Sequence, residues 1–336
     1  MLKPYLAKLS RKENLSETEM VEAMNLIMSG EATQAQIGSF LTALRLKGET
    51  VDEITGAARV MREKSLKVNF QAPVVIDTCG TGGDGANTFN ISTTAAFIVA
   101  GAGVPVAKHG NRAMSSRCGS ADLLEALKVK VDLPPEKVEF CLREAGIGFM
   151  FAPAFHQAMK YAIGPRRELG FRTVFNVLGP LTNPASANCQ LIGVYQAELT
   201  EPLAQVIQRL GVRRAMIVHG AGGLDELSLD GPNKISFLNG GAIQNYTITA
   251  AELGLEPAPN HLLKGESPEE NAKLTARILN GEETGPCLDV VLLNAAAALT
   301  VAGLVSDLKE GIQLARKTVT DGSAYAKLRR LQEVAA

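Results

Sequence analysis

A glycine-rich stretch at residues 77–85, Asp-Thr-Cys-Gly-Thr-Gly-Gly-Asp-Gly, constrains the fold of this chain more than any other feature. It follows a short apolar segment at residues 73–76 and precedes a long apolar segment that begins at Thr93. A buried strand, a glycine-rich loop and a helix start form a phosphate-binding arrangement, because glycines let the backbone approach the anion and free N–H groups face it. The alternative is a tight glycine turn without a ligand, but four glycines with nearby hydroxyls and amides exceed what a turn needs.

The stretch also matches the G-x-G-x-x-G pattern of dinucleotide-binding proteins at Gly80, Gly82 and Gly85. That reading requires a carboxylate about 20 residues further on, for the ribose. Residues 86–121 contain neither Asp nor Glu, and no Walker lysine pattern is present. We therefore expect a phosphate site of another kind. Within it, Asp84 would repel a bare anion, so it is expected to face outward or to meet a cation or a ligand hydroxyl.

The first 70 residues are predicted to be wholly helical. Three capping boxes occur in succession, at Ser16–Glu19, Thr33–Gln36 and Thr50–Glu53, and each pairs a capping hydroxyl with a returning carboxylate or amide. The apolar residues that follow have helical spacing. No β-rich segment interrupts them, so this region is expected to form a small helical unit that packs on the rest of the chain or on a second copy.

From residue 71 onward the pattern changes to strands alternating with helices, which predicts an α/β domain with a mostly parallel central sheet flanked by helices. Strands are expected at residues 73–76, 104–107, 147–151, 190–195 and 215–219, with a short β-rich excursion at 227–250. Residues 290–305 read as a buried helix. We place the domains at 1–70 and 71–336, with a helical excursion near 165–187 that returns to the N-terminal unit.

A second polar cluster follows the strand at 104–107. Lys108 and Arg112 supply positive charge, and Ser115, Ser116 and Ser120 supply hydroxyl donors. The lack of carboxylates from residue 86 to 121 predicts a positive pocket at the carboxyl end of the sheet, where open α/β sheets bind ligands. Seen alone, the cluster reads equally well as a solvated basic loop.

A third cluster, Asp225-Glu226, comes shortly after the strand at 215–219. Two carboxylates after a buried strand suit Mg²⁺, which takes one or two carboxylates and completes its shell with water and phosphate oxygens. Seen alone, an exposed acidic turn is the better interpretation. Together the three clusters describe a polyanion site bridged to Asp225 and Glu226 by Mg²⁺.

Composition excludes several classes of protein. The net charge of -1 gives no global attraction to nucleic acid or to an anionic membrane. The five cysteines show no C-x-x-C pair or zinc spacing, which favours reduced thiols in a cytoplasmic protein. The N-terminus has no secretory apolar core, and the longest apolar run is too short to span a bilayer.

The chain resembles the anthranilate phosphoribosyltransferases of tryptophan biosynthesis, which have the nucleoside phosphorylase-like fold of type III phosphoribosyltransferases. The resemblance rests on motifs in the same order along essentially the whole chain: Gly80-Thr-Gly-Gly-Asp84, Asn90-Ile-Ser-Thr93, Lys108-His-Gly-Asn-Arg112, Arg166 with Leu169-Gly170, Gly179-Pro-Leu-Thr-Asn-Pro184 and Asp225-Glu226. It implies Mg²⁺-dependent transfer of ribose 5-phosphate from phosphoribosyl pyrophosphate (PRPP) to the amine of anthranilate. It also implies a homodimer through the helical domains.

The resemblance also implies roles for individual residues. Lys108, His109 and Arg166 are the implied catalytic residues, and Ser92, Asp225 and Glu226 the metal-linked ones. Implied anthranilate contacts are Gly80, Asn111, His156, Arg166 and Pro180. Implied PRPP contacts are Gly80, Gly82, Gly83, Asp84, Thr88, Asn90, Ile91, Ser92, Thr93, Lys108, Asn111, Arg112, Ser115, Ser116 and Ser120. Either His109 or His156 is suited to take the departing proton or to orient the acceptor.

One residue departs from the family pattern: Lys128 stands where the family often has glycine, and it is expected to lie away from the ligands. Two other functions compete with the transferase. A pyrimidine nucleoside phosphorylase uses a Lys-x-Ser phosphate motif, whereas this chain has Lys108-His-Gly-Asn, and it needs no Asp225-Glu226 pair. A transferase-like nucleic-acid-binding protein would have a basic surface, which the net charge of -1 argues against.

Overall fold

The computed structural model describes residues 1–113 and 117–336. The chain begins with four helices: α1 (Lys3–Ser10), α2 (Glu17–Met28), α3 (Gln34–Lys47) and α4 (Val51–Lys64). All three predicted capping boxes are formed, at Ser16, Thr33 and Thr50, and they start α2, α3 and α4. The sequence signals for these helix starts are therefore confirmed.

The α/β part is built on one mixed sheet. In the described part of the chain this sheet has seven strands in the order β3-β2-β1-β4-β5-β6-β7. The first five in this order are parallel, β6 pairs antiparallel with β5, and β7 pairs antiparallel with β6. The predicted mostly parallel sheet is confirmed, and the β-rich excursion extends the same sheet. The strands are β1 (Ile76–Gly80), β2 (Val106–Gly110), β3 (Ile147–Phe151), β4 (Cys189–Gly193), β5 (Arg214–His219), β6 (Asn233–Asn239) and β7 (Ala242–Ile248).

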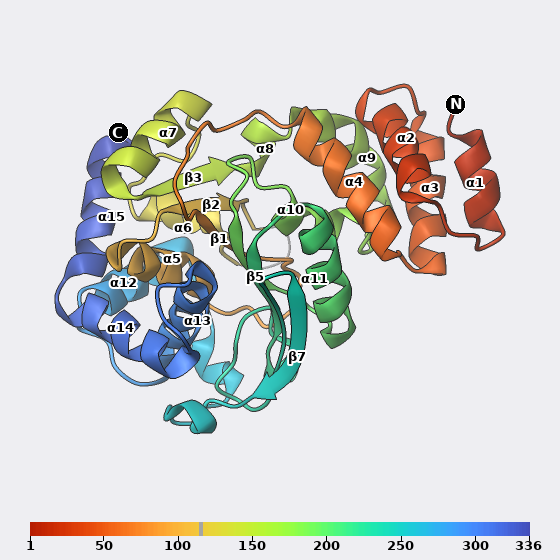
Figure 1. Ribbon diagram of the computed structural model, residues 1–336. Helices are drawn as coiled ribbons and strands as arrows, with labels where there is room; N and C mark the ends of the chain where they lie inside the picture. The colour runs from red at the N-terminus through yellow and green to blue at the C-terminus, as the bar shows by residue number, and fades with distance from the viewer. Residues whose placement is uncertain (114–116) are drawn as a thin grey trace.

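Helices cover both faces of the sheet (Figure 1). The buried α13 (Pro286–Ala302) packs on β4, β5 and α5 (Ile91–Gly101), and it contains most of the apolar run at 290–305 that was expected to be a buried helix. On the other face, α11 (Thr200–Arg209) lies between β5 and α4. The remaining helices of this part are α6 (Ser120–Ala126), α7 (Pro135–Ala145), α8 (Ala152–Phe155), α12 (Pro268–Leu279), α14 (Leu308–Thr320) and α15 (Ser323–Val334). None of the helices in residues 1–113 and 117–336 is long and apolar enough to cross a membrane.

Two helices from the middle of the chain join the N-terminal helices. They are α9 (Lys160–Leu169), which packs on α2 and α3, and α10 (Phe175–Leu181), which packs on α4. Figure 1 shows α9 and α10 beside the N-terminal helices, although about a hundred residues separate them in sequence. The chain therefore leaves the α/β part and returns to the helical unit, and it does so from Lys160, earlier than the expected residue 165.

The two faces of the sheet belong to two apolar cores. Successive strand residues point to opposite faces, so Leu191 lies in the core beneath α13 whereas Ile192 lies in the core shared with α4 and α11. Met216 and Ile217 of β5 divide in the same way. The helical unit is thus continuous with the α/β part through one sheet face, and the carboxyl ends of β2, β1, β4 and β5 lie side by side.

Candidate active site

The glycine-rich loop begins at the carboxyl end of β1. Gly82, Gly83 and Gly85 adopt positive φ angles of 68°, 75° and 77°, which glycine tolerates without strain. Gly80 is needed for a different reason, because a Cβ there would lie 2.4 Å from Oδ2 of Asp225. The loop backbone is therefore shaped by its own glycines and by the close approach of Asp225.

The predicted metal-linked residues meet at this loop. Gly82 N–H donates to Oδ2 of Asp225 at 2.6 Å, and Ser92 N–H donates to Oε1 of Glu226 at 3.2 Å. Asp84 also faces this group, since its Oδ2 lies 3.5 Å from the backbone nitrogen of Asp225. The structure thus brings the loop, the start of α5 and the Asp225-Glu226 pair together.

The electrostatics of these carboxylates favour a cation. Both residues of the pair are half-buried, but protein surrounds their carboxyl groups, and this desolvation raises the pKa of Glu226 to about 7. Desolvation, together with the charges of Asp84 and Glu226, raises the pKa of Asp225 well above its usual range. Within residues 1–113 and 117–336, no group of three or more His, Cys, Asp and Glu side chains forms a metal site by itself. The donor set fits Mg²⁺, which needs only one or two protein carboxylates when water and phosphate oxygens supply the rest.

The residues around the start of α5 divide between surface and core. Asn90 precedes the helix, and its Nδ2 donates to the Cys118 carbonyl at 3.0 Å. Ile91 and Thr93 are buried, and Ile91 N–H donates to the Phe89 carbonyl at 2.8 Å, whereas Ser92 is half-buried. Thr88, in the loop that precedes the helix, forms an isolated antiparallel β-bridge with Lys264. The helix N-terminus therefore lies next to the carboxylate pair, and its Ser92 N–H is bound to Glu226.

Lys108 is a buried residue of β2. It is 3% exposed, and its Nζ donates to the Thr78 carbonyl. Its positive charge lowers the pKa of Glu226 and of Asp77, against their larger desolvation. Lys108 thus lies between the strand ends and the carboxylate pair, where it adds positive charge to the site.

Asp77 is a buried carboxylate that the sequence analysis did not select. It accepts hydrogen bonds from His109 N–H at 3.1 Å and from Nδ2 of Asn183 at 2.7 Å. Burial raises its pKa to about 6. Its place in the glycine-rich motif gave no signal of this role, because both partners are distant in sequence. Asp77 fixes the end of β2, which carries Lys108 and His109.

His109 and His156 face each other, with ring centroids 5.0 Å apart. Burial lowers the pKa of His109 to about 3 and that of His156 to about 4. Nδ1 of His109 lies 3.2 Å from the Gly179 carbonyl, which can only accept, so Nδ1 carries the proton and Nε2 keeps a lone pair. Neither Nε2 atom has a hydrogen-bond partner within the described ranges. The pair offers buried acceptors to a ligand.

The loop after β2 is less positive than expected. Arg112 is exposed and pairs with Glu125 and Asp122 of α6. Oδ2 of Asp122 also accepts from Ala113 N–H and Gly119 N–H, both at 2.9 Å. The positive charge expected at this loop is therefore partly neutralised, because α6 folds its first two turns back onto the loop.

Other predicted residues of this loop lie nearby. Oδ1 of Asn111 accepts from Arg112 N–H at 2.8 Å, and the Asn111 carbonyl accepts from Ser120 Oγ at 3.2 Å. Gly110 has no room for a Cβ, which would lie 2.2 Å from that same Oγ. Ser115 and Ser116 lie outside the described residues.

Arg166 and Pro180 come from the helices that return to the helical unit. The Arg166 guanidinium lies 5.1 Å from the centroid of the Phe175 ring, and burial lowers its pKa. In the part of the chain that the structure describes, it forms no ion pair with a carboxylate. Pro180 is buried in α10, and its carbonyl accepts from Gln190. Arg166 is thus a half-buried cation held by an aromatic face and available to a ligand carboxylate.

Arg172 reaches the glycine-rich loop from the segment between α9 and α10, and the sequence analysis missed this contact. Its Nη2 donates to the Gly83 carbonyl, and its guanidinium lies 4.1 Å from the centroid of the Tyr195 ring. The only sequence signal was the group of cations between residues 166 and 172. A contact across 89 residues leaves no trace in local spacing.

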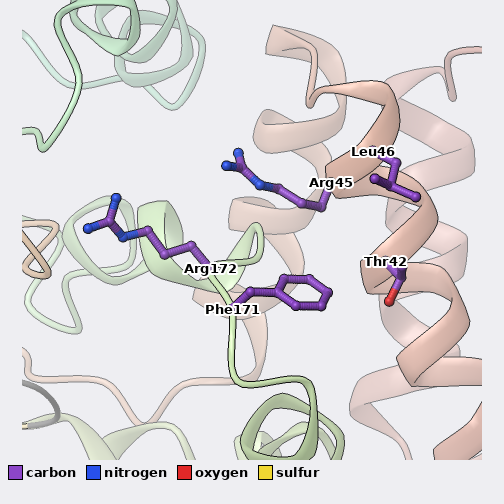
Figure 2. A pocket seen from close by; sticks show the side chains of 5 residues that line it. All are labelled: Thr42, Arg45, Leu46, Phe171 and Arg172. Carbon is purple, nitrogen blue, oxygen red and sulfur yellow. The ribbon is translucent and has the colours of Figure 1, made fainter.

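Two surface hollows lie beside the site rather than in it. One, of about 420 Å³, lies between α3 and residues 171–172 and is lined by Thr42, Arg45, Leu46, Phe171 and Arg172 (Figure 2). The other, of about 470 Å³, lies between residues 67–75 and 184–188. The first adjoins the glycine-rich loop through Arg172, so it marks the seam between the helical unit and the candidate site.

Comparisons with known proteins agree with this geometry. Residues 72–325 match the glycosyl transferase family, a/b domain, and residues 3–65 match the helical bundle domain of the same family. An anthranilate phosphoribosyltransferase of Moorella thermoacetica is 58% identical over 331 residues, which cover 98% of this chain and 97% of that protein. The similarity therefore extends over both parts of the fold.

Solved structures give the same result. The crystal structure of anthranilate phosphoribosyltransferase from Thermus thermophilus has a TM-score of 0.94 and 46% identity, and the match covers 98% of both chains. The Saccharomyces cerevisiae enzyme in complex with PRPP and Mg has a TM-score of 0.92 and 31% identity, covering 99% of this chain and 97% of that one.

Proposed function

This chain belongs to the anthranilate phosphoribosyltransferases of the glycosyl transferase family, and from that premise we propose the reaction and the roles of its residues. The protein transfers the 5-phosphoribosyl group of PRPP to the amine of anthranilate, giving N-(5-phosphoribosyl)anthranilate and pyrophosphate in tryptophan biosynthesis. The observation that carries this function is the meeting of the glycine-rich loop, Lys108 and the Asp225-Glu226 pair at neighbouring strand ends.

The loop and the start of α5 bind PRPP. Backbone N–H groups of Gly83 and Asp84 are placed to donate to its phosphate oxygens, and Lys108 adds a buried positive charge. At the start of α5, the N–H groups of Ile91 and Ser92 donate here to the Phe89 carbonyl and to Glu226. Thr88, Asn90, Asn111, Arg112 and Ser120 surround this cradle and contact the ribose and phosphates. Gly82 N–H must leave Asp225 to reach the ligand, since the two are hydrogen-bonded here.

Mg²⁺ is held by Asp225 and Glu226 with Ser92 beside them. The raised pKa values of the two carboxyl groups support this role, because desolvation, with a smaller contribution from repulsion between neighbouring carboxylates, disfavours their charges and a divalent cation would stabilise them. When bound, Mg²⁺ neutralises charge on the pyrophosphate. Asp84, which lies against Asp225, is placed to contact a ribose hydroxyl or a metal-bound water.

The chemistry needs charge stabilisation more than a strong base. Breaking the bond between ribose C1 and pyrophosphate leaves negative charge on the pyrophosphate, which Lys108 and the loop N–H groups stabilise. The anthranilate amine is an arylamine and is mostly unprotonated at neutral pH, so it needs orientation for attack on C1.

The acceptor lies between Arg166 and the two histidines. Arg166 pairs with the anthranilate carboxylate, a role that suits an arginine without an ion pair among residues 1–113 and 117–336. Gly80, Asn111 and Pro180 line the path. The lowered pKa values of His109 and His156 make them weak bases, suited to accept a hydrogen bond from the amine and to pass on its proton as the C1–N bond forms.

The assembly and location of the protein are also part of the proposal. A homodimer forms through the helical domains, where Leu46 of α3 and Ile163 of α9 are 75% and 47% exposed and offer apolar surface to a partner. We set the domains at residues 1–70 and 71–336, with the returning helices added to the first. The five free cysteines support a reducing, cytoplasmic compartment.

Product analysis tests the function against its nearest competitor. Incubation with PRPP, Mg²⁺ and anthranilate is expected to release one pyrophosphate for each anthranilate consumed. The parallel reaction contains thymidine and inorganic phosphate without PRPP, and no thymine should form in it. Phosphate-dependent cleavage of thymidine with no consumption of PRPP would establish a nucleoside phosphorylase instead.

A further inference from the structure

We propose that Arg172 is a positioning residue for PRPP: by holding the Gly83 carbonyl, it sets the plane of the peptide between Gly83 and Asp84. That plane decides where the Asp84 N–H group points. The inference rests on the proposed function, because it assigns this N–H group to the PRPP cradle. Arg172 itself acts through the backbone and needs no contact with the substrate.

Phe171 and Arg172, which lie between the helical unit and the candidate site, point in opposite directions. Figure 2 shows the Phe171 ring directed toward α3 and the Arg172 side chain extending away from it. The Phe171 ring lines the hollow with Thr42 and Leu46 of the helical unit. Arg172 donates from Nη2 to the Gly83 carbonyl, and a Cβ at residue 83 would lie 3.3 Å from its Nε. The guanidinium therefore packs directly against the glycine backbone.

The geometry of a peptide bond links this contact to an amide donor. In a trans peptide the C=O and the following N–H point to opposite sides of the chain. Because Arg172 holds the Gly83 carbonyl on its own side, Asp84 N–H must point away from Arg172. Within residues 1–113 and 117–336 the Gly83 carbonyl has no other hydrogen-bond donor, and Asp84 N–H has no acceptor. Without Arg172, no hydrogen bond to the C=O or N–H of this peptide would remain in the described structure, and only the Asp84 side chain, which accepts from Ala86 N–H at 3.1 Å, would still hold the segment.

Tyr195 holds Arg172 in place. The guanidinium lies 4.1 Å from the ring centroid, within the range of a cation–π contact. Tyr195 is tied to the same loop, since its N–H donates to Thr81 Oγ1 at 3.3 Å and Thr81 N–H donates to the Gly193 carbonyl at 2.9 Å. Arg172, Tyr195 and the loop thus form one connected unit at the carboxyl ends of β1 and β4.

The test compares Arg172→Met, which removes the donor, with Arg172→Lys, which keeps a donor and a charge. Binding of PRPP with Mg²⁺ is measured by calorimetry, and KM for each substrate by steady-state kinetics. Arg172→Met should weaken PRPP binding and raise its KM about tenfold, as expected for one charge-assisted hydrogen bond. The KM for anthranilate and the melting temperature should stay near the wild-type values, and Arg172→Lys should recover part of the loss. Arg167→Met, at an exposed arginine of α9, is the control and should change neither KM.

Two further measurements distinguish positioning from long-range electrostatic attraction. Tyr195→Leu should raise the PRPP KM about threefold, and Arg172→Met combined with Tyr195→Leu should be no worse than Arg172→Met alone, because the residues act as one unit. The ratio of variant to wild-type KM should persist between about 0.05 M and about 0.5 M salt. A ratio that falls toward one in high salt would show long-range attraction and overturn the proposal.

Other results also decide the question. Loss of affinity for both substrates together with a lowered melting temperature would show a merely structural role and reject positioning. A change of less than twofold in PRPP binding would also reject the positioning role. If the wild type binds PRPP better than Arg172→Met but does not consume anthranilate, the positioning role stands and the proposed acceptor falls. If the wild type binds no PRPP, both are wrong.

Discussion

Oδ2 of Asp225 accepts a hydrogen bond from the backbone N–H of Gly82 at 2.6 Å. This contact joins a carboxylate of the metal pair to an amide of the anion cradle. Each group has a better partner in the substrate complex: a carboxylate prefers Mg²⁺, and an amide prefers a phosphate oxygen. Binding of PRPP with Mg²⁺ therefore replaces one internal hydrogen bond with two ligand contacts, and cradle and metal site are expected to fill together.

Removal of the carboxylate pair should weaken Mg²⁺ use. The variant Asp225→Ala with Glu226→Ala is expected to need at least about tenfold more Mg²⁺ for half-maximal activity, because the protein ligands of the metal are gone. Activity is measured against Mg²⁺ concentration at fixed PRPP. Glu256→Gln, at an exposed carboxylate, serves as the control and should leave the curve unchanged. An unchanged metal dependence in the double variant would remove the metal assignment.

Loss of Arg166 should affect the acceptor alone. Arg166→Ala is expected to raise the KM for anthranilate about tenfold or more, because a charge-assisted contact to its carboxylate is lost. The KM for PRPP should stay within about twofold of the wild-type value. Initial rates at varied concentrations of each substrate measure both constants, and Arg167→Ala is the matched control. Equal loss for the two substrates would refute the assigned role.

The buried His109 predicts a definite pH dependence of stability. Its folded-state pKa of about 3 lies below the unfolded value of about 6.5, so the unfolded state binds more protons in that window and stability falls as pH falls through it. His109→Gln removes this titration. The free energy of unfolding of the wild type relative to His109→Gln should drop by roughly 2 kcal/mol between pH 7.5 and pH 5.

Urea unfolding of both proteins at the two pH values measures this difference. Titrating groups that do not interact with His109 contribute equally to the two chains and cancel in the comparison, and His156→Gln in both chains removes the one histidine that does. A pH-independent difference would mean that His109 titrates alike in the folded and unfolded states, and it would contradict the desolvated pair that it forms with His156.

The backbone conformation at Lys128, the one residue that departs from the family pattern, shows why glycine is common at this position. It adopts a positive φ of 61°, the left-handed region that favours glycine. Lys128 is exposed and follows α6. Lys128→Gly should therefore stabilise the protein by about 1 kcal/mol without changing activity. Urea unfolding tests this, with Lys130→Gly, at an exposed residue without positive φ, as a control that should not gain stability. A loss of stability in Lys128→Gly would show that strain at this position is negligible.

Local sequence signals predicted much of the fold. The capping boxes at Ser16, Thr33 and Thr50 depend on residues three apart, and all three formed. Buried apolar runs predicted that parallel strands exist, because a strand covered on both faces has no polar side. The bounds of two were wrong: β1 is Ile76–Gly80 rather than 73–76, and β2 is Val106–Gly110 rather than 104–107, since both strands continue into the polar motifs that follow the apolar runs. The return of α9 and α10 to the helical unit was expected as well, since the segment with two prolines did not fit a strand.

Contacts between distant segments were not predictable in the same way. The hydrogen bond from Arg172 to Gly83 and the contacts of Asp77 with His109 and Asn183 join residues 32 to 106 positions apart, and nothing in the spacing announces them. The positive pocket was predicted from the lack of carboxylates at residues 86–121, yet the first turns of α6 bring Asp122 onto the same loop. The order of charged residues along the sequence does not show that a later helix will fold back onto an earlier loop.

The most direct test of the central claim is the fluorescence of anthranilate. With PRPP and Mg²⁺, the wild-type protein should reduce the emission of anthranilate until the limiting substrate is consumed. Omission of PRPP, or chelation of Mg²⁺ with EDTA, should stop the decrease. A folded protein that leaves the emission unchanged in the complete mixture would contradict the assignment of this site to phosphoribosyl transfer.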